Sequence, residues 1–525
     1  MSLTNSRRTA ALYVLLAVAA ATRLWMQAAA MPPYAGLDEI YHVGRLAFVL
    51  EEGRSPSMTE ASLPPYVNRS VAGDPRALPA FGVIGAEWPK VARSRALLQP
   101  DSPLQVADLR PYSGANYEAQ QPNIYYRLAA PRAKWFGSRT PLMELRVWRG
   151  FSVFCSIVII IATAYVGHRF AGPAGVLAAV WLMSMPTWLT LVVRAGNDAL
   201  ACAFMAAGYA LTVAASRRRV LWVAEAVVWA LALATKLYSW PAAVVLPFFW
   251  HIQKAPYRRR ALVLAFGAFA VFGTAFELAS RTNNPLGLFA FDRPAAPAAA
   301  GTTPIDYGSV VRIIIATGAW TSAQHWNALR PLAIALYLGP ILVLTGYSLW
   351  SSRHARKHSF WMAAIAIGAF ALAQAVNLAG YIHQAKMQNS PLPAGGKEGW
   401  YWYSIAPLLI GTLGALVCRY APRLIVIFQT AWLVGWDVLI HEGALFQDFA
   451  GATSPEAGDA LFRWGPRAWP FAGPSLELAG VGPGAGWVTA MRLFEVVVVA
   501  LLLVLVLRNR ATDREQFELA PMPRE

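Results

Sequence analysis

Long apolar runs, separated by short basic clusters, constrain this sequence more than any other feature. Hydrophobic residues make up 57% of the 525 positions and charged residues only 14%, so most of the chain is suited to an environment without water. A helix of about 20 apolar residues crosses the hydrocarbon core of a bilayer. The sequence therefore predicts an all-α polytopic membrane protein with about twelve transmembrane helices. The predicted spans lie near residues 9–30, 150–167, 172–193, 198–215, 220–236, 239–252, 261–280, 331–350, 359–380, 402–418, 423–441 and 487–507.

The basic residues predict on which side of the membrane each connection lies. The formal net charge is +17, yet Lys and Arg form no extended basic domain and instead stand at the ends of apolar runs. We therefore expect no nucleic-acid partner. Placing the N-terminus in the cytoplasm puts every short basic cluster there, among them Arg217–Arg219 and Arg258–Arg260. Because basic residues are enriched in cytoplasmic connections, both termini are expected inside and the long connections outside.

This topology divides the chain into alternating membrane and outer segments. We predict a first transmembrane helix (1–30), an extracytoplasmic loop with amphipathic helices and catalytic acids (31–149), a transmembrane bundle (150–280), an outer loop (281–330), a second bundle (331–441), an outer loop (442–486), and a last helix with a cytoplasmic tail (487–525). The first run would also suit a cleaved signal peptide. Arg23 falls too late in it for a simple signal core, so we expect a retained helix. Cys155, Cys202 and Cys418 all lie in apolar runs, which predicts packing roles rather than disulfides or a metal site.

The stretch Gly36–Gly53, GLDEIYHVGRLAFVLEEG, places two acids and a histidine directly after the first predicted span. Apolar residues recur at helical spacing until a glycine supplies a stop. Residues 39–52 are therefore predicted to form an amphipathic helix that lies in the membrane interface. Asp38 falls at its N-cap, and Glu39 and His42 lie one turn apart. Capping a helix start is by itself a sufficient reason for both acids, so a functional role depends on the rest of the chain.

A second surface helix is predicted late in the first outer loop, where residues 117–135 read YEAQQPNIYYRLAAPRAKW. Pro122 would stand at the helix start. Glu118, just before it, is either a solvated loop carboxylate or part of a site. Residues 54–110 show no pattern of regular structure. The predicted apolar stripe of this helix is Ile124, Leu128 and Trp135, with Tyr125, Tyr126, Arg127 and Lys134 at the membrane interface.

A series of short motifs carries a resemblance to a known family. In chain order they are GLDEIYH, YEAQQPNIYY, LRVWRGFS, GNDALA, ATKLYS and EGWYWYSIAP. Together they resemble the polyprenyl-phosphate-sugar-dependent glycosyltransferases of the GT-C fold, and most of all the superfamily of protein O-mannosyltransferases and lipid A aminoarabinose transferases. The resemblance implies a catalytic or acceptor-positioning carboxylate after the first span, which matches Asp38 with Glu39 beside it. In that family a His often precedes the proline of the second motif, whereas this chain has Gln121.

The residues themselves suit such chemistry. Moving a sugar from a lipid phosphate to an acceptor needs a carboxylate near the acceptor hydroxyl, cations that hold the departing phosphate, and a groove that reaches the bilayer. The candidate phosphate-binding cations on the outer side are Arg45, Arg127, Arg194, Lys236, Arg281, Arg330 and Lys397. Further candidate substrate-binding residues are His42, Tyr117, Glu118, Asn197, Asp198, Trp400 and Tyr403.

Several of these candidates have a plain structural alternative. Lys236 ends an apolar span, where an ionisable group is costly without a partner, or it snorkels to the interface and anchors the span. Arg194 and Asp198 belong to a site, or they only mark a helix start. The aromatic residues Trp400–Tyr403 stack on a sugar, or they form part of an interfacial aromatic belt.

The sequence requires no cofactor, although a divalent metal stays open. Its candidate ligands are Glu39, His42, Glu118 and His325, because such an ion would neutralise the phosphate leaving group. The spacing DExxH is not the HExxH of zinc peptidases, so a zinc protease is not expected.

These observations predict an integral membrane glycosyltransferase that moves a sugar from a polyprenyl-phosphate donor to an extracytoplasmic lipid, glycan or protein acceptor, with inversion and with Asp38 as the base. We expect the bacterial inner (plasma) membrane, and the basic clusters predict that Asp38 and the active site lie on its extracytoplasmic side. Two other classes stay open. A lipid or glycan transporter or flippase would place its ionisable residues near mid-membrane within a repeat-symmetric bundle. A non-enzymatic assembly subunit would use the outer loops for docking.

Overall fold

The computed structural model describes most of the predicted membrane core. The described residues are 3–30, 39–56, 121–138, 141–214, 219–236, 331–351, 405–450 and 485–519, with single positions at 251, 259, 263, 267, 367 and 368. The elements in chain order are α1 (Leu3–Ala30), α2 (Glu39–Glu52), α5 (Ile124–Trp135), α6 (Pro141–Ala171), η4 (Gly172–Val176), α7 (Leu177–Met183), α8 (Pro186–Val193), α9 (Asn197–Ala214), α10 (Arg219–Leu233), α14 (Pro331–Ser351), α16 (Ala406–Tyr420), α17 (Arg423–Ala450) and α20 (Ala485–Leu519). Every regular element within these ranges is a helix, as predicted.

Membrane-crossing helices account for much of this bundle. Within the described residues, four stretches are long and apolar enough to span a bilayer: Arg8–Ala29, Met143–Met183, Asn197–Ala214 and Ala490–Arg508. The chain is therefore an integral membrane protein. The predicted spans at 239–252, 261–280 and 359–380 lie almost wholly outside the described residues, so the number of about twelve spans stays a prediction.

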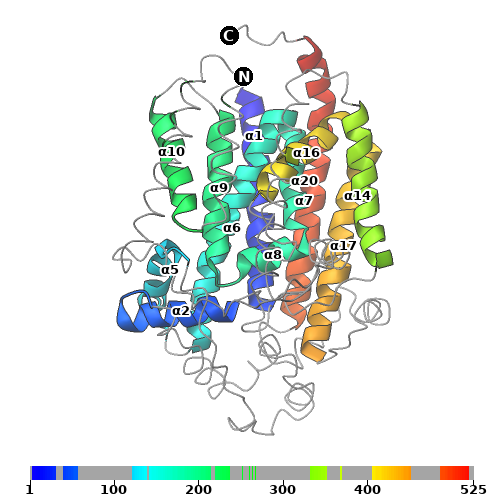
Figure 1. Cartoon of the computed structure of the whole chain (residues 1–525). Coiled ribbons are helices and arrows are strands. Elements are labelled where there is room, and N and C mark those ends of the chain that lie inside the picture. The colour runs from blue at the N-terminus through cyan, green and yellow to red at the C-terminus, as the bar shows by residue number, and fades with distance from the viewer. Residues whose placement is uncertain are drawn as a thin grey trace, which may run out of the picture.

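α6 is the central helix of the bundle and packs against α1, α9 and α16 (Figure 1). The pattern of α1 shows how an apolar helix selects its buried face. Leu12, Leu16, Ala20 and Leu24 are at most 1% exposed, and their spacing places them on one side of the helix. Val14 and Trp25, which fall on other sides, are more than half exposed at 63% and 51%. Such side chains suit contact with lipid.

The predicted single span at 172–193 is wrong, because η4, α7 and α8 occupy this stretch. Gly172 follows α6 with φ 61°, a left-handed conformation that glycine adopts without a steric clash. Pro186 begins α8, and Met185 before it is extended with ψ 106°, as residues that precede proline prefer. The break at Gly172 falls beside the predicted gap between the spans 150–167 and 172–193. The break at Pro186 was not predicted, since the residues on either side of it are apolar.

α2 and α5 lie at the end of the bundle opposite to the start of α1, and α2 runs across the bundle axis (Figure 1). α2 has the predicted bounds. It stops where Gly53 takes φ 69° and donates its N–H to the carbonyl of Val49 at 3.0 Å, which is a common way for glycine to end a helix. The predicted second surface helix is confirmed as α5.

The buried face of α5 differs from the predicted one. Tyr125 and Tyr126, predicted at the membrane interface, are fully buried, and α5 packs against α2 and α6. Leu128 and Trp135, predicted as the apolar stripe, are 42% and 73% exposed. The tyrosines therefore belong to the protein interior, where their ring faces pack and their hydroxyl groups find hydrogen-bond partners.

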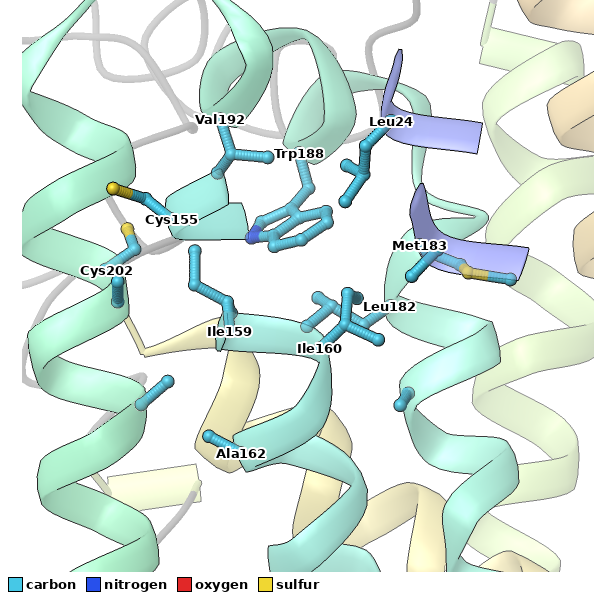
Figure 2. Close-up of a cluster of buried hydrophobic side chains, with 14 of the residues drawn as sticks. Leu24, Cys155, Ile159, Ile160, Ala162, Leu182, Met183, Trp188, Val192 and Cys202 are labelled. Carbon is cyan, nitrogen blue, oxygen red and sulfur yellow. The ribbon is translucent and has the colours of Figure 1, made fainter. Parts of the chain in front are cut away.

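An apolar cluster joins α8 to the core next to this end of the bundle. Trp188 is fully buried and lies beside Ile159, with Cys155 and Cys202 close by (Figure 2). These two cysteines and Cys418 are buried and form no disulfide, which agrees with the predicted packing role.

A buried ionic network ties the first helix to the last. Arg23 of α1 donates to both carboxylate oxygens of Asp437 in α17, from Nη2 at 2.7 Å and from Nε at 3.0 Å. Arg492 of α20 donates to Asp437 at 2.9 Å and to Glu495 at 2.6 Å. Gln27, one turn after Arg23, accepts a further hydrogen bond from it at 3.3 Å. Charges inside a membrane bundle are tolerated when they pair in this way.

Candidate functional site

A second group of charged side chains gathers at the end of the bundle that carries α2 and α5. It joins residues from α2, α5, α6, the turn between α8 and α9, the first turn of α9, and the segment that follows α10. We call it the α2 cluster and define it as Glu39, His42, Arg45, Tyr126, Arg149, Arg194, Asp198 and Lys236. All of these residues are buried.

Glu39 is held by α6 and by the turn between α8 and α9. Arg149 donates from Nε to Oε1 at 2.9 Å and from Nη2 to Oε2 at 2.6 Å, a fork geometry that suits a guanidinium and a carboxylate. The backbone N–H of Ala195 donates to Oε1 at 2.8 Å. Arg149 also donates to the carbonyl of Ala28 at 3.0 Å, so this one ion pair joins α1, α2, α6 and the α8–α9 turn.

Asp198 in the first turn of α9 is the second buried carboxylate of the cluster. Lys236 donates to its Oδ1 at 2.6 Å, and Arg194 donates to its Oδ2. Lys236 is 6% exposed, so it is not a lysine that extends freely into water. The snorkelling alternative for Lys236 therefore lacks support, and the ammonium group belongs to the cluster.

His42 lies between the two halves of the cluster. Its Nδ1 is 2.7 Å from the Tyr126 hydroxyl, and its Nε2 is 3.9 Å from Oδ2 of Asp198. Burial, followed by the positive charges of Arg194 and Lys236, lowers the pKa of His42 well below its usual value of 6.5. The imidazole is therefore neutral. If the tyrosine hydroxyl donates to Nδ1, the proton of the neutral ring is on Nε2 and faces the carboxylate.

Arg45 closes the cluster on the α5 side. It donates to the carbonyl of Gln121 at 2.8 Å and lies over the ring of Tyr126, with its guanidinium carbon 4.0 Å from the ring centroid. Its Nη2 is also 3.4 Å from the side-chain oxygen of Asn123. Arg45 thus contacts two oxygens and an aromatic face among the described residues.

The backbone at Gly196 allows α9 to begin close to α2. A Cβ atom at this position would lie 3.0 Å from the His42 ring and 3.2 Å from Nε of Arg194. Both distances are shorter than ordinary contacts, so a side chain here would push the imidazole and the guanidinium aside. Gly196 therefore permits the close approach of His42 to the start of α9.

The cluster carries more positive than negative charge. Its charged groups are four cations and two carboxylates: Arg45, Arg149, Arg194 and Lys236 against Glu39 and Asp198. Within the described residues, four cationic side chains therefore gather in one buried volume. Guanidinium and ammonium groups brought together in this way form a setting that suits an anionic ligand.

The metal candidates are not brought together by the described residues. Glu39 and His42 both lie in the cluster, but Glu39 holds Arg149 and His42 contacts Tyr126. Across the described ranges, no group of three or more His, Cys, Asp or Glu side chains has a geometry suited to a metal ion. Glu118 and His325 lie outside these ranges.

Of the remaining predicted site residues, two are described by the structure and the others lie outside the described ranges. Asn197 begins α9 beside the cluster and is fully buried. Arg127 is exposed on α5 and does not join the cluster. The predicted residues outside the described ranges are Asp38, Tyr117, Glu118, Arg281, Arg330, Lys397, Trp400 and Tyr403.

Two members of the α2 cluster, Arg149 and Tyr126, were not predicted as site residues from the sequence. Arg149 stands at the entry of an apolar run, where an arginine is usually a topology signal, although it lies inside one of the motifs that carry the family resemblance. Tyr126 was placed at the membrane interface. The sequence did hold a signal for its burial, because small residues recur at helical spacing on the side of α5 that carries Tyr126, and small residues allow close packing. These residues are Ala129, Ala130 and Ala133, and all are buried with Tyr126.

Comparisons with known proteins give few matches. No protein-family model matches the chain, and no curated protein matches it. Among solved structures, ArnT from Cupriavidus metallidurans bound to undecaprenyl phosphate overlaps 92% of this chain and 77% of its own, with 13% identity and a TM-score of 0.43. The same protein in the apo state overlaps 95% and 78%, with 15% identity and a TM-score of 0.42.

Proposed function

We propose that this protein is an integral membrane glycosyltransferase of the GT-C type that transfers a sugar from a polyprenyl-phosphate donor to an extracytoplasmic acceptor. The observation that carries the proposal is the gathering of four buried cationic side chains in the α2 cluster. Arg194 and Lys236 both donate to Asp198, and Arg45 donates to the carbonyl of Gln121. A phosphate is the anion that matches buried guanidinium and ammonium groups of this kind.

The charge of the cluster also suits the reaction. A polyprenyl-phosphate sugar is a phosphodiester with one negative charge, and the polyprenyl phosphate released from it carries up to two. Cations fixed in a buried site stabilise the phosphate as its charge grows, so they favour the transition state over the bound donor.

Asp38 serves as the base in this proposal. It is covalently bonded to Glu39, whose carboxylate lies in the cluster. The acceptor hydroxyl attacks the anomeric carbon from the side opposite to the phosphate, its proton passes to Asp38, and the electrons of the breaking C–O bond remain on the phosphate. Before transfer, Asp38 and the donor carry one negative charge each. Afterwards Asp38 is neutral and the phosphate carries both, so the total negative charge beside the cations is the same before and after transfer.

Glu39 has a positioning role in this scheme. Both of its carboxylate oxygens accept hydrogen bonds from Arg149, and one of them also accepts the N–H of Ala195. These contacts engage both oxygens of the carboxylate. Glu39 therefore holds α2 against α6 and the α8–α9 turn, and thereby fixes the chain beside Asp38.

The proposed setting is the bacterial inner membrane, with the α2 cluster on the extracytoplasmic side. The short basic clusters of the sequence support this orientation. In it, α2 and α5 lie in the outer interface, where a lipid-borne sugar arrives from the bilayer and a lipid, glycan or protein acceptor arrives from either phase. No divalent metal is required by the scheme.

A transfer assay tests the proposal. Purified protein in lipid nanodiscs is given a panel of radiolabelled polyprenyl-phosphate sugars and an extract of the cell envelope as the source of acceptor. We expect label to pass from at least one donor to the extract. Asp38→Asn, which keeps the size and much of the hydrogen bonding of the residue, should lower transfer by roughly 10² to 10⁴ because the amide cannot take the proton.

Glu39→Gln is the matched control, examined at equal abundance and equal melting temperature. It should weaken the fold more than Asp38→Asn does, since it removes a charge from a buried ion pair. Near-normal transfer by Asp38→Asn would remove Asp38 from the mechanism. A wild-type protein that neither transfers sugar nor binds polyprenyl phosphate would refute the glycosyltransferase and favour a transporter or an assembly subunit.

A further inference from the structure

Asn197 is a buried amide whose hydrogen-bonding groups are not used within the described structure. It is the first residue of α9 and is 0% exposed. Among the described residues, neither its side-chain oxygen nor its side-chain nitrogen has a hydrogen-bond partner. A buried polar group without a partner destabilises the folded state, and such groups are rare enough in proteins that each one needs a reason.

The position of Asn197 relates it to the α2 cluster. Gly196 before it packs against the His42 ring, and Asp198 after it holds Arg194 and Lys236. The amide therefore belongs to the same short turn as the proposed phosphate-binding cations, at the end of the bundle where α2 and α5 lie (Figure 1). A ligand held by those cations would lie against the turn to which Asn197 belongs.

The chemistry of the amide identifies which neighbouring atoms suit it. A carboxamide donates through nitrogen and accepts through oxygen. A phosphate offers acceptors only, so it would leave the amide oxygen unsatisfied. A guanidinium or ammonium group offers donors only, so it would leave the amide nitrogen unsatisfied. A hydroxyl both donates and accepts, and two hydroxyl groups on adjacent carbons satisfy both ends of one amide at the same time.

We infer that Asn197 binds a pair of adjacent hydroxyl groups on the donor sugar, and that the substrate class is a polyprenyl phosphate linked to a sugar with such a pair. This inference rests on the proposed glycosyltransferase function and assigns a task to one residue within it. The cations hold the phosphate, which every donor shares, whereas Asn197 distinguishes one sugar from another. A site built to hydrogen-bond a hydroxyl strongly rejects an analogue that lacks it, because the buried protein group is then left without a partner.

The experiment varies the substrate and the protein together. The probes are polyprenyl phosphate without sugar, a polyprenyl-phosphate sugar that the wild type uses, and its analogues with one or the other of the adjacent hydroxyl groups removed. The measurements are the Kd of polyprenyl phosphate and kcat/KM for each sugar-linked donor. For the wild type, we expect each deoxy analogue to lower kcat/KM by roughly 5- to 100-fold, the effect of one to two hydrogen bonds.

Asn197→Ala should lower kcat/KM for the natural donor by a similar factor and should leave the Kd of polyprenyl phosphate within about twofold. The variant should also lose discrimination, so that the natural and deoxy donors react at nearly equal rates. Gln429→Leu is the matched control, since Gln429 of α17 is another buried amide whose oxygen has no partner among the described residues. It should leave all of these ratios unchanged.

Each outcome decides the inference. If Asn197→Ala weakens the binding of polyprenyl phosphate as much as that of the sugar-linked donor, Asn197 contacts the phosphate and the inference is wrong. If wild type and variant discriminate equally against the deoxy donors, another residue reads the sugar. If Asn197→Ala does not fold, Asn197→Ser replaces it, and the wild type is still tested with the natural and the deoxy donors. Equal use of these donors by the wild type overturns the inference. A wild type that uses no donor at all refutes the proposed function instead.

Discussion

Replacing Lys236 by methionine removes one positive charge from the α2 cluster and keeps a side chain of similar length. In the wild type, its ammonium group is 2.6 Å from Oδ1 of Asp198, and the side chains are 7% and 2% exposed. Because both groups are buried, salt screens this pair much less than a surface pair. The variant lowers the positive excess of the described cluster from two charges to one.

The expected loss of phosphate binding follows from the chemistry of a buried charged hydrogen bond. Such a bond contributes about 1.5 to 3 kcal/mol, which corresponds to a roughly 10- to 150-fold increase in the Kd of polyprenyl phosphate. Lys236→Arg should retain part of the affinity, since the charge remains while the geometry of the ammonium group is lost.

A double-mutant cycle with Asp198 separates two roles of the lysine. Asp198→Asn raises the positive excess, so we expect unchanged or tighter binding of polyprenyl phosphate. If Lys236 contacts the phosphate, adding Lys236→Met to Asp198→Asn still weakens binding by about the single-variant factor. If Lys236 only neutralises Asp198, the lysine has no task once the carboxylate is gone, and the double variant binds like the wild type.

The assay measures binding of a short-chain radiolabelled polyprenyl phosphate to protein in nanodiscs, with the matching polyprenol as the uncharged control. Variants are compared at equal abundance and after their melting temperatures are recorded, because breaking a buried ion pair costs about 3 to 5 kcal/mol of stability. Wild-type affinity in folded Lys236→Met, or full recovery in the double variant, would refute a phosphate-binding role for Lys236.

Three further predictions address the fold, the pH dependence and the topology. Asp437→Ala should cost about 3 to 5 kcal/mol of unfolding free energy, because it leaves Arg23 and Arg492 buried with less negative charge; an unchanged melting temperature would contradict this. Burial lowers the pKa of His42 below its usual 6.5, so at a pH below about 6.5 only the unfolded chain takes up this proton. As the pH is lowered from there, the free energy of unfolding should decrease by up to 1.4 kcal/mol per pH unit. His42→Gln should remove this decrease in melts recorded at different pH values. A cysteine placed at Ser113 should react with a membrane-impermeant thiol reagent in intact cells, and labelling only after permeabilisation would reverse the orientation.

The secondary structure could be predicted wherever one helix face differs from the other. α2 follows the spacing of its apolar residues and its terminal glycine, and its bounds match the prediction. Within the stretch 172–193 the interruption at Pro186 was not predicted, because apolar residues on both sides hide the position where the helix ends. α5 was correct as a helix but wrong in its buried face, because packing against α2 and α6 decides which tyrosines are enclosed.

Part of the candidate site could also be predicted from the sequence. His42, Arg194 and Lys236 stand out in sequence because ionisable groups at the ends of apolar runs need an explanation, and the structure brings them together around Asp198. The pairing of Arg149 with Glu39 spans 110 positions of sequence, and no local pattern indicates it. The charge excess likewise depends on which side chains meet, a property of the folded chain.

α1 connects the two ionic networks, and this connection explains how the position of α2 is fixed. The carbonyl of Ala28 is one of the last four of its helix, which have no partner within the helix, and Arg149 supplies one while it holds Glu39. One turn earlier, Arg23 anchors the same helix to Asp437 in α17. A guanidinium can hold a carboxylate with two N–H groups and still donate a third to a carbonyl, a task that an ammonium group cannot perform with the same geometry. The end of α1 and the start of α2 are therefore held together by one side chain, that of Arg149.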